Sequence, residues 1–222
     1  MNRKLKILGA LMAALALTAV MASAASAQFT STAEHTILSG TQKTGTNDVF
    51  SAGSGFGAIT CENATFSGTG STKNDATQAV KPTYTNCKDS FGRAVDLENN
   101  LTYTFTPQQT TTVEGKTVLD TANVHVSGSM KLSVTSGGSV ICTVTITTPQ
   151  TNNGISYTNL GGTSGVEVTS HSTNVKSTIE GGFFNCGTST TNATAGTYDG
   201  IAIVTGKDTS GNAVAISVDD VK

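Results

Sequence analysis

Tryptophan is absent from this sequence of 222 residues, which also has only 3 prolines and 13% charged residues. An average domain carries about 25% charged residues, so much of the polar surface here must come from Ser and Thr. The scarcity of proline argues against a mucin-like stalk, which is rich in Ser, Thr and Pro. The absence of tryptophan argues against a typical sugar platform, because such platforms stack sugars on flat aromatic rings.

Positive charge is scarce as well. Three of the 13 Lys and Arg residues lie within the first six positions, so residues 28–222 carry 10 basic against 15 acidic side chains, a net charge of −5. Nucleic-acid binding draws most of its affinity from Lys and Arg side chains that neutralise phosphates. We therefore expect no nucleic-acid partner.

Motifs for catalysis and metal binding are missing too. There is no C-x-x-C pair and no histidine close in sequence to a cysteine, which argues against zinc and against thiol redox chemistry. No G-x-S-x-G motif occurs, and Lys43-Thr44-Gly45 has no S-x-x-K partner to supply a nucleophile. The sequence thus predicts no metal, no cofactor and no catalytic residue.

The first 27 residues have the three zones of a secretory signal peptide. Basic residues between Arg3 and Lys6 precede an apolar run over residues 7–20, and Ala25-Ser26-Ala27 has the small–x–small pattern that signal peptidase cuts. The apolar run is about 14 residues long, shorter than the roughly 20 that a bilayer span needs. The sequence predicts that residues 1–27 are removed, that the mature chain begins at Gln28, and that it is secreted without a transmembrane anchor.

Four cysteines in an exported chain predict two disulfides. The residues are Cys61, Cys87, Cys142 and Cys186, and they allow three pairings. We favour Cys61–Cys87 with Cys142–Cys186, because sequential pairing gives each half of the chain one disulfide.

Alternation of apolar and polar residues is the main structural signal, and it has the period of a β-strand with one buried face. The clearest example is an eleven-residue strand expected over 124–134. Further strands are expected over 101–106 and 140–148, and over 201–204 and 214–218 as a hairpin. Weaker candidates are 29–38, 58–66, 155–157, 166–169 and 175–179.

Short strands separated by Gly, Asn and Ser turns predict an all-β antiparallel sandwich or barrel. We expect a disulfide-linked β-sandwich, either one extended sandwich or two small lobes over residues 28–136 and 137–222. Each half places a cysteine near aromatic residues, which is compatible with a diverged duplication. Gly137-Gly138 is the best boundary, but it could equally be a hairpin turn within one continuous domain.

The remaining candidates for chemistry are isolated in the sequence. A surface position explains each histidine: His35, His125 and His171. A glycosidase needs two carboxylates at a fixed separation, and the sequence brings together no two of those available: Glu62, Asp96, Glu98, Glu167 and Glu180.

Two further groups have a structural explanation beside the functional one. Asp208, Ser210 and Asn212 place oxygens at alternate positions as calcium loops do, but hairpin turns favour the same residues. Four rings remain on which a sugar could stack: Tyr84, Tyr103, Tyr157 and Tyr198. Tyr103 belongs to an apolar strand face and is expected in the core.

Several segments resemble a group of uncharacterised secreted proteins of actinobacteria. They are Ile59-Thr60-Cys61, Ala64–Thr69, Pro82–Cys87, Leu101–Thr104 and Gly196–Gly200. The resemblance implies export and a β fold, and it brings no known activity. Members of this group often carry a cysteine where this chain has Leu101, so the resemblance implies that an additional disulfide is missing here.

The leading functional hypothesis is a secreted, non-enzymatic protein with a structural or interaction role, whose partners are components of the cell envelope or the extracellular matrix. The alternative is a glycan- or cell-wall-binding module. A secreted hydrolase is the third hypothesis, and it would require a pair of carboxylates or a His–Ser–acid arrangement.

Overall fold

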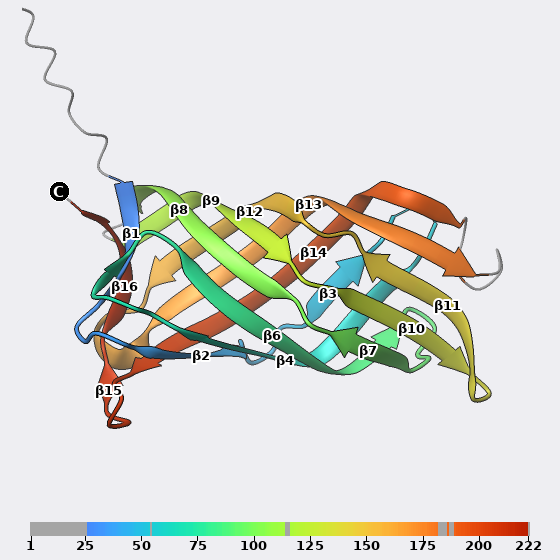
Figure 1. The fold of residues 1–222 in the computed structure, drawn as a ribbon, viewed down its shortest axis with the longest axis horizontal. Coiled ribbons are helices and arrows are strands. Elements are labelled where there is room, and N and C mark those ends of the chain that lie inside the picture. The colour runs from blue at the N-terminus through green and yellow to red at the C-terminus, as the bar shows by residue number, and fades with distance from the viewer. Residues whose placement is uncertain (1–25, 54, 114–115, 182–185, 187–188, 222) are drawn as a thin grey trace, which may run out of the picture.

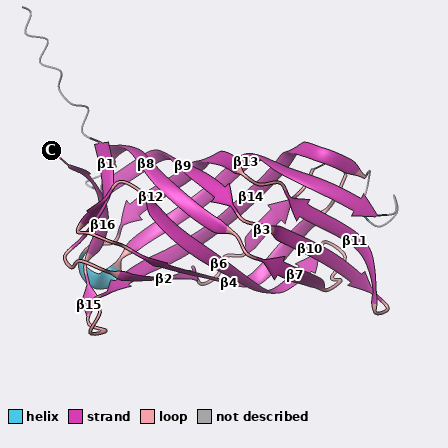
Figure 2. Ribbon diagram, viewed as in Figure 1, coloured by secondary structure: helices cyan, strands magenta, loops and turns pink. Residues whose placement is uncertain are grey.

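The computed structural model describes residues 26–53, 55–113, 116–181, 186 and 189–221. The predicted signal peptide lies outside this part of the chain except for Ser26 and Ala27, which begin the first strand. Strands make up most of the described chain (Figure 2).

The strands, in chain order, are β1 (Ser26–Ser31), β2 (Ile37–Gln42), β3 (Asp48–Ser51), β4 (Ala58–Thr69), β5 (Asn74–Asp75), β6 (Gln78–Asp89), β7 (Val95–Asn99), β8 (Thr102–Val113), β9 (Lys116–Ser127), β10 (Met130–Ser136), β11 (Ser139–Ile146), β12 (Gln150–Asn159), β13 (Val166–Gly181), β14 (Thr190–Lys207), β15 (Ala213–Val214) and β16 (Ile216–Val221). A short 3-10 helix, η1 (Gly162–Ser164), precedes β13.

Eight antiparallel strands close into a barrel in the order β14-β2-β4-β6-β8-β9-β12-β13. The barrel closes because β13 pairs with β14 from Val166↔Val204 to Ile179↔Thr190. Figure 1 shows the result as an elongated barrel whose strands are inclined to its long axis. Such inclination is required when a sheet closes on itself.

Additional strands continue the same wall toward the second end of the barrel. Beyond the end of β2, β3 takes its place between β14 and β4. Beyond the ends of β8, β9 and β12, the wall is continued by the ladder β7-β10-β11-β13. An isolated bridge joins Lys88 of β6 to Ala94, the residue just before β7. The barrel thus has two levels, in which β4, β6, β13 and β14 run through while the other wall strands are interrupted.

A separate three-stranded sheet, β16-β1-β5, lies at one end of the barrel, close to the C-terminus (Figure 1). Phe29 of β1 contacts the ring of Tyr157 edge-on, with the ring centroids 5.6 Å apart. The side chain of Asn159 accepts a hydrogen bond from the Val218 amide and donates one to its carbonyl, which ties β16 to β12. This sheet covers the interior at that end.

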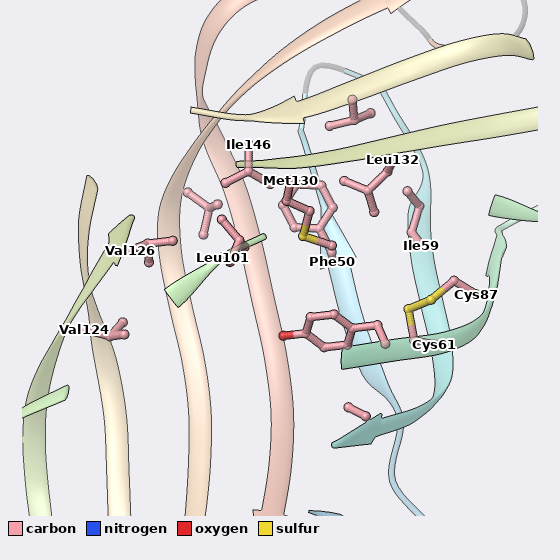
Figure 3. Packing of buried hydrophobic residues seen from close by; sticks show 14 of the residues in the cluster. Phe50, Ile59, Cys61, Cys87, Leu101, Val124, Val126, Met130, Leu132 and Ile146 are labelled. Carbon is pink, nitrogen blue, oxygen red and sulfur yellow. A yellow bond between two sulfur atoms is a disulfide. The ribbon is translucent and has the colours of Figure 1, made fainter. Parts of the chain in front are cut away.

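Apolar side chains point into the barrel, and the alternate residues face outward. Figure 3 shows buried residues from several strands, such as Phe50, Met130 and Leu132, directed toward a common interior. Ile59, Leu132 and Val144 are at most 1% exposed. Full burial of such a side chain contributes about 1.5–3 kcal/mol, so this cluster supplies the main stabilisation of the fold.

The all-β antiparallel prediction is confirmed, but the predicted sandwich is wrong. A sandwich consists of two sheets with separate edges, whereas β14 pairs along one side with β13 and along the other with β2 and β3. Both architectures have one buried and one exposed face per strand, so the alternation of residues does not distinguish between them. Gly137 and Gly138 form the turn between β10 and β11, and strands from both sides of this turn build the barrel.

The eleven-residue strand predicted over 124–134 is interrupted. β9 ends at Ser127 and β10 begins at Met130, while the inward alternation is kept by Val126 and Met130. Gly128 between them has φ +92°, a left-handed conformation that interrupts a regular strand. The expected C-terminal hairpin is present as β14–β15, and β16 pairs with β1 instead.

The two disulfides have the pairing expected from the sequence, Cys61–Cys87 and Cys142–Cys186. The first joins directly opposed residues of β4 and β6. Disulfides persist in oxidising compartments, so this feature is consistent with an extracellular protein. Within the described residues, no helix has the length and apolar character required to span a membrane.

Candidate functional site

The barrel interior contains a cavity of about 170 Å³. Its wall is predominantly apolar and includes Leu38, Phe105, Val124, Val126 and Ile155, which come from four different strands. An engineered apolar cavity of about 150 Å³ is large enough to bind benzene. The cavity can therefore hold a small apolar molecule.

A chain of phenol hydroxyls crosses one side of this cavity. The hydroxyl oxygen of Tyr84 lies 3.0 Å from that of Tyr103 and 3.1 Å from that of Tyr198, and Tyr198 donates a hydrogen bond to Asp48 Oδ1. Each phenol has a single O–H to donate. Because Tyr198 uses its hydrogen on Asp48, Tyr84 donates to Tyr198 and Tyr103 donates to Tyr84, so the whole tyrosine chain points toward the carboxyl group.

Asp48 is the end point of the tyrosine chain. It is the first residue of β3, faces inward with Phe50 and is only 3% exposed. Gly200 on β14 makes room for it, because a Cβ at position 200 would lie 2.3 Å from Asp48 Oδ1. The second carboxyl oxygen, Oδ2, is buried and has no hydrogen-bond partner.

Burial controls the ionisation of these groups. Loss of solvent raises the pKa of Asp48 above its ordinary value, and the hydrogen bond from Tyr198 offsets part of this shift. Burial likewise raises the pKa of Tyr103 to about 12 and those of Tyr84 and Tyr198 well above the ordinary value for tyrosine. The three phenols therefore stay neutral near neutral pH and can act as donors.

The cavity wall carries acidic but no basic side chains within the described residues. Its titratable carboxyls are Asp48 and Asp75, and no Lys, Arg or His is among its lining residues. Asp75 is the last residue of β5 in the β16-β1-β5 sheet, and both of its oxygens accept hydrogen bonds from Ser71 and Thr72. Asp48 Oδ2 is thus the acidic oxygen of the wall that has no partner.

Replacing Asp48 with Asn is expected to remove part of the pH dependence of stability. A folded-state pKa above the ordinary 3.8 means that the stability conferred by the neutral carboxyl is fully present below about pH 3.8 and is lost as the pH rises through the raised pKa. As the pH rises from about 3 to about 8, wild type should lose about 1–3 kcal/mol of unfolding free energy that Asp48→Asn keeps. The reason is that a buried charge without a partner costs that much or more. Urea unfolding at both pH values measures this difference.

A difference between the two proteins that does not change with pH would contradict this expectation. The phenols facing Asp48 do not interfere with the measurement, since burial keeps Tyr84, Tyr103 and Tyr198 protonated over this range.

The histidines singled out in the sequence lie on the outer surface. His125 contacts Thr151 through Nδ1 at 3.3 Å, and His171 pairs with Asp199 while its side chain is 74% exposed. His35 is an exposed residue with φ +52°. The structure thus places each of them where it has access to solvent, away from the cavity.

The candidate carboxylates also lie on the outer face, spread over three strands. Glu62 on β4 pairs with Lys88, and Glu167 on β13 pairs with Lys43. The others, Asp96 and Glu98 of β7 and Glu180 of β13, are exposed. Among the described residues, no group of three or more His, Cys, Asp or Glu side chains could hold a metal ion.

Asp208 closes the loop between β14 and β15. Its Oδ1 accepts hydrogen bonds from the amides of Ser210 and Asn212, and its Oδ2 accepts one from the Asn212 side chain. The hydrogen bonds from Asn212 are the main cause that lowers the pKa of Asp208. This arrangement is that of a hairpin turn. The sequence left two explanations for these residues, a calcium loop and a hairpin turn.

The central residue of the site, Asp48, was missed by the sequence reasoning. The available signal is the segment Asp48-Val49-Phe50-Ser51, in which Asp48 and Phe50 are two residues apart. In a strand they therefore face the same side, and Phe50 is a residue expected to face inward. Tyr103 is expected in the core, whereas in the structure it is partly buried and packs against the core cluster. Tyr84 and Tyr198 were noted as sugar-stacking candidates, but their hydroxyls join the internal tyrosine chain.

Comparison with models of known protein families, with curated proteins and with solved structures gives no match.

Proposed function

We propose that this protein is an exported, non-enzymatic β-barrel that binds a small, mainly apolar molecule in its interior. The observation that supports this is the apolar cavity of about 170 Å³ lined by strands of the barrel wall. Eight-stranded barrels have an interior that is either filled by side chains or holds one small ligand. Here the side chains leave space along the axis, which favours the second case.

The chemistry of the wall defines the class of ligand. Apolar surface removed from water contributes about 25 cal/mol per Å², so a hydrocarbon body gains affinity by entering the cavity. Side chains such as Val124, Val126 and Phe105 can supply such contact without specific hydrogen bonds. The proposal gives the expected interaction role a concrete form, namely the uptake of a small molecule.

The two other hypotheses gain no supporting observation. A glycan site needs exposed aromatic rings with a polar surround, whereas Tyr84 and Tyr157 are buried. A hydrolase needs catalytic groups in a cleft, whereas the nearest acid–histidine pair, Asp199 with His171, is exposed on the outer face. Both hypotheses, and association with the cell envelope, stay predictions.

Filling the cavity is expected to abolish binding. Val124 is 5% exposed and lines the cavity, so Val124→Phe adds a ring inside it, while Val140 is 59% exposed on β11 and Val140→Phe adds the same ring outside. Saturation with an uncharged apolar probe, 1-octanol, at ten times its Kd should add about 1.4 kcal/mol to the stability of wild type and Val140→Phe. Val124→Phe should show no such gain.

Thermal unfolding with and without 1-octanol, supported by calorimetric titration, measures this effect. Ala202→Leu provides a milder filling of the same cavity in case the Val124 variant does not fold, since Ala202 is 8% exposed and lines the wall. An equal response of the filled and control variants would place binding outside the barrel and would refute the proposal.

A further inference from the structure

Asp48 Oδ2 is the feature of the cavity that an apolar ligand alone does not explain. The side chain is 3% exposed, lines the cavity and has one oxygen without a hydrogen-bond partner. Leaving a buried polar atom unpaired costs about 1–3 kcal/mol, and a charged one costs more. A protein retains such a group at a cost to its stability where the group has a role in binding.

The protein's own neighbouring donors cannot satisfy this oxygen. Tyr198 donates its hydrogen to Oδ1, Tyr84 donates to Tyr198, and Tyr103 donates to Tyr84. With one hydrogen per phenol, the chain is fully used. In its ionised form Asp48 therefore offers Oδ2 as an open acceptor to a molecule in the cavity.

The charge of the wall indicates the kind of donor. The lining contains the carboxyls of Asp48 and Asp75 and no basic side chain among the described residues. The oxygens of Asp75 are already bonded within its own turn. The cavity thus presents one open acidic oxygen surrounded by aromatic and aliphatic side chains, and a cation complements it.

We infer that the molecule bound in the barrel is an apolar amine, whose protonated nitrogen pairs with Asp48 Oδ2 while its hydrocarbon part fills the cavity. This inference rests on the proposed function and adds the head group. Hydrogen bonds between charged partners are about twice as strong as those between neutral groups, so an ammonium binds Asp48 more tightly than an alcohol does. A carboxylate head group is repelled.

Three probes with the same eight-carbon body test the head group: octylamine, 1-octanol and octanoate. An alkylamine is protonated near neutral pH, as the side chain of lysine is. Calorimetric titration of the wild-type protein should give octylamine a Kd about 10- to 100-fold lower than that of 1-octanol, the range that corresponds to a hydrogen bond between charged groups. Octanoate should bind most weakly.

Matched variants assign the preference to one carboxyl group. Asp48→Asn should remove the preference for octylamine while the Kd for 1-octanol changes by less than about threefold, a difference below 1 kcal/mol. Asp199→Asn is the control, since Asp199 lies on the same pair of strands opposite Val49 but points outward, with its side chain 45% exposed. This control should keep the full preference.

The outcomes separate the inference from the function on which it rests. Equal binding of the three probes, or an octylamine preference that survives Asp48→Asn, overturns the amine inference and leaves an apolar binding protein. Binding of none of the probes overturns both. The ligand series on wild type decides the matter even if Asp48→Asn does not fold.

Discussion

Replacing Cys142 and Cys186 together with alanine is expected to lower the free energy of unfolding by about 4 kcal/mol. The two residues are 44 positions apart. Their bond restricts a long loop in the unfolded chain and so lowers the entropy of the unfolded state. In the chain-entropy model, a loop of this length stabilises the fold by about 4 kcal/mol, which is lost with the bond. Since domains are stable by only about 5–15 kcal/mol, the loss is a large part of the total.

The surroundings of Cys186 explain why this disulfide also matters for the folded barrel. Its sulfur lies 3.3 Å from the carbonyl oxygen of Glu180, and a Cβ at Gly181 would lie 2.4 Å from that sulfur. The backbone of β13 is therefore packed directly against the disulfide at the end of the strand that also pairs with β11. Loss of the bond should affect the second level of the barrel first.

Guanidinium unfolding of the variant and of wild type measures the difference. The Cys61→Ala/Cys87→Ala pair provides a comparison, because its shorter separation of 26 residues predicts a loss of about 3.5 kcal/mol. A loss below about 1 kcal/mol in the Cys142 variant would show that the unfolded chain is already restricted in this region.

The local features of the fold were accessible from the sequence. Alternation along residues such as Val140 to Ile146 predicts a strand, and four cysteines in an exported chain predict two disulfides. Closure of the barrel was not accessible, because it depends on partners far apart in the chain. Gly40 pairs with Val204, for example, and nothing in either segment alone specifies the other.

The candidate site was hidden for the same reason. The hydrogen bond from Tyr198 to Asp48 joins residues 150 positions apart, and the tyrosine chain draws on β6, β8 and β14. Sequence reasoning selected carboxylates and histidines by type, and the structure places those groups on the outside. What identifies Asp48 is its burial and its unpaired oxygen, and both arise only when the barrel is closed.

The break at Gly128 yields the second large expected effect. Gly128→Ala should lower the free energy of unfolding by about 2–6 kcal/mol, since an unfavourable backbone conformation and overpacking each cost about 1–3 kcal/mol. The glycine has φ +92°, and an added Cβ would lie 2.0 Å from the carbonyl oxygen of Asn100. A backbone atom cannot rotate away as a flexible side chain can, so the strands themselves would have to move.

Gly137→Ala is the matched control for this prediction. Gly137 also has a positive φ, +59°, but an added Cβ meets nothing within 4 Å. Its substitution should cost only the backbone contribution, about 1 kcal/mol. Chemical denaturation of the two variants therefore separates the collision from the conformational cost, and equal losses would contradict the predicted collision.

The consequence for the cavity follows from where Gly128 lies. The amide of Asn100 donates to the carbonyl of Ser129, so the β7–β8 and β9–β10 connections cross between the two levels side by side. Val126 and Met130, on either side of the break, both line the cavity. Displacing these two connections should therefore weaken 1-octanol binding in Gly128→Ala but not in Gly137→Ala. Unchanged binding in a destabilised Gly128→Ala variant would contradict this and would show that the cavity tolerates movement of the two connections.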